Sequence, residues 1–139
     1  MEKLPLILLV DDEPATNYTH ERLLKQLGVA EEIHAVTSGE EAIALLRRET
    51  PLAPALVLLD VNLPGLGGFE FIDAFQHLPA AQRAATHIVL LTGGMTSQDL
   101  LRLNELPIAG LVIKPLTREK LNTLLQLHFH RQLPEEPVG

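Results

Sequence analysis

Polar residues follow four runs of apolar residues in this chain, and their types are those that handle cations and phosphates. They are the adjacent acids Asp11 and Asp12, and then Asp60, Thr92 and Lys114. A carboxylate at the end of an apolar run is poorly solvated, so its charge needs compensation. If the three carboxylates meet, either some are protonated or a cation lies among them. Mg²⁺ fits the second case, because it takes oxygen ligands and is commonly held by one or two carboxylates together with a phosphate.

The other two residues point to phosphoryl chemistry. Lys114 can supply a positive charge to one phosphate oxygen, and the hydroxyl of Thr92 can donate a hydrogen bond to another. Gly93 follows Thr92 and leaves room beside it. Phosphoryl transfer asks a protein mainly to position groups and to neutralise charge around one in-line nucleophile. Asp60 is the candidate nucleophile, because a carboxylate can form an acyl phosphate.

These residues meet only if the apolar runs before them are strands of one sheet. The predicted strands are residues 6–10, 32–36, 55–59, 87–91 and 111–113. Most of these runs are continuously apolar rather than alternating, and the second is the weakest. A continuous apolar run indicates burial on both faces, which is typical of a parallel sheet with helices on each side.

Helical periodicity returns between the predicted strands. Helices are predicted at residues 14–27, 39–48, 96–106 and 117–131, and another carries residues 69–75 and is bounded by Pro79. Ser38 and Glu41 form a capping-box pattern, and Gly28 is a stop signal. A strand–helix order repeated five times predicts a three-layer α/β domain with right-handed crossovers. In such a sheet the functional site lies beyond the carboxyl ends of the strands, which is where the polar residues stand.

Composition narrows the class of protein. The chain has 139 residues, no cysteine and a formal net charge of -7, so it suits one acidic domain without disulfides. An acidic domain of this size lacks the basic face that direct nucleic-acid binding needs. The apolar runs are too short to span a membrane, and the first residues do not match a signal peptide, so we expect a cytoplasmic protein. Residues 1–131 are predicted to form the domain, and residues 132–139 a tail or the start of a linker.

The candidate residues also have plain structural interpretations. Asp11 and Asp12 are suited to capping the helix that begins near Pro14. Asp60 is compatible with a buried, protonated acid or with an Asx turn, because Asn62 and a proline follow. Neither interpretation explains why polar groups end four separate runs. The six histidines are interpreted neither as metal ligands nor as phosphodonors: His20, His34, His77, His87, His128 and His130.

Five stretches in order resemble the receiver domain of two-component response regulators, the CheY-like family. The resemblance covers residues 6–127, and the stretches that carry it are Val10–Pro14, Thr37–Ala42, Leu58–Glu70, Leu91–Gly93 and Ile113–Pro115. It implies a flavodoxin-like (βα)5 fold with a parallel five-stranded sheet in the order 2-1-3-4-5.

The same resemblance implies a role for each site residue. Asp60 would accept a phosphoryl group from a histidine kinase or a histidine phosphotransfer protein. Asp11 and Asp12 would bind Mg²⁺ together with Asp60 and the backbone carbonyl of Asn62, while Thr92 and Lys114 would contact the phosphoryl group. The face formed by the fourth helix, fifth strand and fifth helix, residues 96–127, would bind a downstream partner or a second copy of the chain. No enzymatic activity is implied beyond self-phosphorylation and autodephosphorylation.

One departure from the family leaves alternatives open. Many members carry an aromatic residue three positions before the lysine, where this chain has Leu111. A pseudo-receiver that binds partners without phosphorylation is therefore a second interpretation. A Mg²⁺-dependent phosphatase with an aspartyl nucleophile is a third, although such enzymes usually place the nucleophile after the first strand.

Overall fold

A parallel sheet of five strands forms the centre of the protein. A computed structural model describes residues 3–48, 55–60, 68–93, 108–130 and 133. The strands are β1 (Leu4–Val10), β2 (Ala30–Val36), β3 (Ala55–Asp60), β4 (Thr86–Thr92) and β5 (Gly110–Ile113). Their order in the sheet is β2-β1-β3-β4-β5, and every neighbouring pair is parallel. The predicted strands and their order are therefore confirmed.

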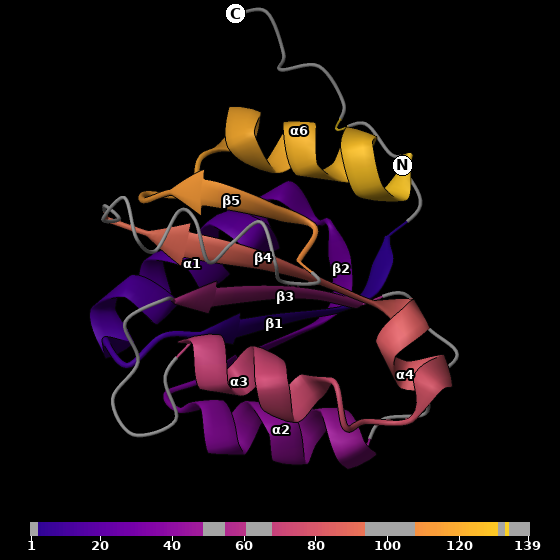
Figure 1. Cartoon of the computed structure of the whole chain (residues 1–139). Coiled ribbons are helices and arrows are strands. Elements are labelled where there is room, and N and C mark those ends of the chain that lie inside the picture. The colour runs from indigo at the N-terminus through magenta and orange to yellow at the C-terminus, as the bar shows by residue number, and fades with distance from the viewer. Residues whose placement is uncertain (1–2, 49–54, 61–67, 94–107, 131–132, 134–139) are drawn as a thin grey trace, which may run out of the picture.

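Helices cover both faces of this sheet. On one face lie α2 (Gly39–Arg48) and α3 (Gly68–Phe75), side by side in Figure 1. Across the sheet from them lie α1 (Pro14–Leu27) and α6 (Arg118–Phe129). Each layer closes one apolar cluster, since alternate residues of a strand point to opposite faces. In β3, Leu56 and Leu58 join the cluster under α1 and α6, whereas Val57 and Leu59 join the one under α2 and α3. The predicted three-layer arrangement is thus confirmed.

The helix ends follow their sequence signals. Gly28 has a φ of 63°, and its N–H donates to the carbonyls of Leu24 and Lys25 at the end of α1. This left-handed backbone costs glycine little. At the start of α2, the Ser38 hydroxyl accepts a hydrogen bond from the Glu41 N–H at 3.2 Å. These contacts fix the residue at which α1 ends and the residue at which α2 begins.

Two features differ from the sequence-based expectation or lie beyond it. A short helix, α4 (Ala80–Ala85), follows Pro79, for which the sequence predicts only a helix boundary. Proline is favoured at a helix start, so the same residue also opens the next helix. Secondly, Leu133 lies in the predicted tail, but it is buried, and its N–H donates to Asn122 Oδ1 at 2.8 Å. The predicted helix 96–106 lies outside the described residues, as does the rest of the tail.

No helix in the described ranges is both long enough and apolar enough to cross a membrane.

The surroundings of His87 disfavour the charged form of its ring. Its Nδ1 is buried with no hydrogen-bond partner among the described residues, and its ring lies 4.6 Å from that of Phe129 and 6.0 Å from that of His128. Burial, and secondly the charge of His128, lower the pKa of His87 from 6.5. A lowered pKa means that the fold favours the neutral ring. His87 therefore contributes full stability above about pH 6.5 and loses it as the pH falls through its lowered pKa.

We expect His87→Leu to reduce the pH dependence of stability. The melting temperature of the wild type should fall between about pH 7.5 and about pH 5, and the variant should lose less over the same interval, because the ring that resists protonation is gone. Thermal unfolding followed by circular dichroism measures both slopes. His77→Gln, at an exposed histidine of the same chain, is the matched control and should behave as the wild type. If the melting temperature fell equally with pH in the wild type and in His87→Leu, the loss of stability in acid would not come from His87.

Candidate functional site

The sheet brings the acids of the first and third predicted strands together. Asp60 is the last residue of β3, and Asp11 follows directly after β1. These two strands are neighbours, and Val10 is level with Leu59 in their register. Asp11 and Asp60 therefore leave the sheet at the same height, side by side, although 49 positions separate them in the sequence. Asp12 follows Asp11 into the same space.

The three carboxylates form a group that fits a hard divalent cation. One oxygen from each of Asp11, Asp12 and Asp60 lies within 4.8 Å of the others. Asp11 and Asp60 are buried, whereas Asp12 is exposed. The all-oxygen donor set and its open side suit Mg²⁺, which keeps several of its waters when it binds protein carboxylates.

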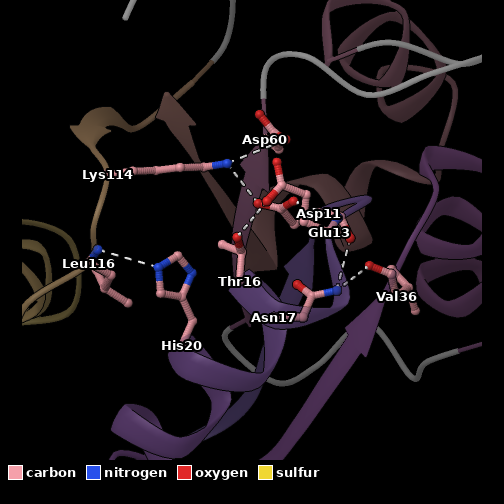
Figure 2. A network of polar contacts seen from close by, with 9 residues as sticks. All are labelled: Asp11, Glu13, Thr16, Asn17, His20, Val36, Asp60, Lys114 and Leu116. Carbon is pink, nitrogen blue, oxygen red and sulfur yellow. Dashed lines mark hydrogen bonds and ion pairs between the residues drawn. The ribbon is translucent and has the colours of Figure 1, made fainter. Parts of the chain in front are cut away.

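Lys114 is the cation that this group contacts. Its Nζ lies 2.8 Å from Asp11 Oδ2 and 3.4 Å from Asp60 Oδ2, as Figure 2 shows. Burial acts to lower the pKa of Lys114, but the hydrogen bonds and negative charges of Asp11 and Asp60 outweigh burial and raise it. The ammonium group thus stays charged and bridges the two buried carboxylates.

Asp11 makes a local contact before α1, but it is not the helix cap of its plain structural interpretation, because the N-cap of α1 is Glu13, which has no side-chain cap hydrogen bond. Its Oδ1 accepts a hydrogen bond from the Glu13 N–H at 2.9 Å, just before α1 begins. The second oxygen, Oδ2, is the one that accepts from Lys114. One carboxylate therefore holds the turn before α1 and contributes to the charged site at the same time.

Asn17 supports Asp11 from below and is not among the site residues predicted from the sequence. Its amide Nδ2 donates to the backbone carbonyls of Asp11, at 2.9 Å, and Val36, at 3.1 Å. Figure 2 shows this side chain beneath the turn that carries Asp11. Asn17, His20 and Leu24 form the buried stripe of α1. In the sequence, Asn17 and His20 stand at helical spacing with Leu24. This spacing places the three residues on one face of a helix, but it does not reveal what the two polar side chains contact.

Thr92 and the loop after it complete the described part of the site. Thr92 ends β4, is buried, and its backbone carbonyl accepts a hydrogen bond from the Lys114 N–H at 2.7 Å. A Cβ placed on Gly93 would meet no atom of the described residues within 4 Å. Asn62 lies outside the described residues, and its carbonyl as a metal ligand stays a prediction.

Comparison with known proteins assigns the family. A sequence model of the response regulator receiver domain matches residues 7–126. The chain belongs to the receiver domain family of response regulators. A two-component response regulator from Cytophaga hutchinsonii has a similar structure, with a TM-score of 0.81 and 28% identity over 94% of this chain and 100% of that one.

Two further relatives bear on the site and on the context of the domain. The receiver domain of the sensor histidine kinase PA1611 from Pseudomonas aeruginosa was solved with a magnesium ion coordinated in its active site cleft. It has a TM-score of 0.72 and 25% identity over 90% of this chain and 96% of that one. The sensor protein GacS of Pseudomonas syringae is 29% identical over 120 residues, which is 86% of this chain but only 13% of that protein.

We expect Lys114→Met to destabilise the protein when no divalent cation is added. The change leaves two buried carboxylates facing each other without their ammonium partner, which should cost about 3 kcal/mol in the free energy of unfolding. Mg²⁺ should stabilise this variant more than the wild type, because the competing positive charge has been removed. Urea unfolding with and without Mg²⁺ measures both effects.

Lys25→Met is the matched control for this measurement. Lys25 pairs with Glu21 at 3.0 Å on the surface of α1, and its side chain is 64% exposed. Removal of such a surface pair changes stability by at most about 0.5 kcal/mol. A Mg²⁺ effect that is equal in the wild type and Lys114→Met would show that Lys114 and the cation do not compete for the same carboxylates.

Proposed function

We propose that this domain is the phosphoacceptor switch of a two-component phosphorelay and that Asp60 receives the phosphoryl group. The observation that supports this most is the single cluster formed by Asp60, two further carboxylates and Lys114 at the carboxyl ends of the strands. The rigid support of Asp60 adds to it, since residues 56–59 of β3 are fully buried on both faces. A fixed carboxylate meets an in-line donor at little entropic cost.

The proposed step is a transfer to a carboxylate oxygen. An Asp60 oxygen forms a bond to phosphorus while the bond from phosphorus to the donor's histidine nitrogen breaks. The electron pair of the broken bond stays on that nitrogen, and one proton from solvent makes the leaving group neutral imidazole. Mg²⁺, when bound by Asp11, Asp12, Asp60 and the carbonyl of Asn62, would neutralise phosphoryl oxygens. Lys114 pairs with another oxygen, and the Thr92 hydroxyl donates to a third.

The partners follow from the same proposal. A histidine kinase or a histidine phosphotransfer protein supplies the phosphoryl group, and the relation to a sensor protein supports this class of donor. A downstream protein, or a second copy of the chain, binds the face that includes β5 and α6. Leu111 on that face is 37% exposed and replaces the aromatic residue common in the family. We place the protein in the cytoplasm, without direct nucleic-acid or membrane binding.

We expect acetyl phosphate and Mg²⁺ to add one phosphoryl group to the wild type. Intact-mass spectrometry and gel retardation that alkali abolishes measure the gain. Asp60→Asn should abolish it, because an amide oxygen is a poor nucleophile and forms no acyl phosphate. Asp73→Asn is the matched control, since Asp73 is an exposed acid on α3, and it should be phosphorylated as the wild type is. Chelation of Mg²⁺ should suppress the reaction in the wild type and in Asp73→Asn.

The same experiment separates the alternatives. No mass gain in the wild type would contradict the switch and favour a pseudo-receiver that binds partners without phosphorylation. Rapid turnover of phosphate esters would instead indicate an aspartyl phosphatase. A gain that persists in Asp60→Asn would place the phosphoacceptor at another residue.

A further inference from the structure

Two residues that have no role in the proposed function form hydrogen bonds with the backbone next to Lys114. Lys114 follows β5, which has only four residues and lies at the end of the strand order. Its side chain reaches the carboxylates over a flexible four-carbon stem, so its reach depends on where the backbone is fixed. A groove of about 380 Å³ lies here, lined by α1 residues and by Lys114 and Pro115. Packing against α1 is therefore incomplete at this point.

Hydrogen bonds add to the packing of Val112 and Leu116, the buried core residues on either side of this stretch. The Lys114 N–H donates to Thr92 O at 2.7 Å, and Pro115 has no N–H. The next amide, Leu116 N–H, donates to His20 Nε2 at 3.4 Å, a contact drawn in Figure 2. His20 is 3% exposed and comes from α1, 96 positions earlier. It is thus the partner from α1 for the backbone that follows Lys114.

The carbonyls on either side of Lys114 have a partner too. Lys120, in the first turn of α6, donates from Nζ to the carbonyl of Ile113 at 2.7 Å and to that of Pro115 at 3.1 Å. One ammonium therefore spans Lys114 by binding the residue before it and the residue after it. The Thr117 hydroxyl accepts from the Lys120 N–H at 3.2 Å, which fixes the turn from which Lys120 reaches back.

We propose that His20 and Lys120 are positioning residues for Lys114, which hold its backbone from α1 and from α6 so that its ammonium meets the phosphoryl group. The hydrogen bonds described for these two residues go to the chain that carries Lys114 rather than to the carboxylates. The role of His20 needs a neutral ring with its proton on Nδ1, since only then does Nε2 carry a free lone pair. The inference rests on the proposed function, because it assigns a purpose to Lys114.

The test compares phosphorylation rates with acetyl phosphate and Mg²⁺ in matched variants. His20→Leu removes the acceptor for Leu116, whereas His20→Gln keeps an acceptor at the position of Nε2. Lys120→Met removes the ammonium, whereas Lys120→Arg keeps a cationic donor. Each removal should lower the rate about threefold to tenfold, the equivalent of one lost hydrogen bond, and each conservative change should restore it. Lys25→Met, which alters the net charge in the same way at a surface pair on α1, should leave the rate unchanged.

A double-mutant cycle distinguishes positioning from a general structural role. In a Lys114→Met background, His20→Leu and Lys120→Met should have no further effect, because the group they position is absent. Equal slowing with and without Lys114 would overturn the proposal, as would wild-type rates in both single variants. Beryllofluoride affinity, followed by fluorine NMR, gives the same comparison where the Lys114→Met rate is too slow to measure. A wild type that takes no phosphoryl group contradicts the proposed function itself, whereas unaffected variants of a phosphorylated wild type contradict only this inference.

Discussion

Repulsion between carboxylates at the carboxyl ends of β1 and β3 is the constraint on which the site depends. Oxygens of Asp11 and Asp60 lie no more than 4.8 Å apart, and both residues are buried. At an effective dielectric constant of about 20, two such charges repel by about 3 kcal/mol. That is a large part of the 5–15 kcal/mol, roughly, that holds a domain folded. Lys114 offsets this cost by contacting both carboxylates, so the position of one lysine affects stability and, in the proposed switch, function as well.

The sheet holds these charges in place because its centre is buried on both faces. β1 and β3 lie inside the sheet order, and their side chains alternate between the two apolar clusters. Such a strand has little freedom to tilt, so the carboxylate at its end keeps its direction. β5 differs, since it is short and lies at the end of the strand order. The chain on either side of this lysine forms hydrogen bonds with both helices: Leu116 N–H donates to His20 of α1, and Lys120 of α6 donates to the carbonyls of Ile113 and Pro115.

Sequence patterns predicted the parts of the protein that depend on residues close together in the chain. Continuous apolar runs indicated the strands, and the polar residues after them indicated which edge carries the site. The supports of that site were not predictable in the same way. Asn17 and His20 occupy the buried stripe of α1, where polar residues are costly unless they find partners. Their partners are the carbonyl of Val36 and the amide of Leu116, and only the folded chain brings those close.

The charge balance of the site explains why the backbone of Lys114 should be fixed while its ammonium group stays able to move. Three carboxylates against one ammonium leave an excess of two negative charges. In the proposed switch, phosphorylation replaces the charge of Asp60 with a group of nearly two charges, so the excess grows. Lys114 then gains more from the phosphoryl oxygens than from Asp11, and its Nζ must exchange partners over a short distance. A backbone anchored to Thr92, His20 and Lys120 permits that exchange through side-chain rotation alone, without reordering of the chain.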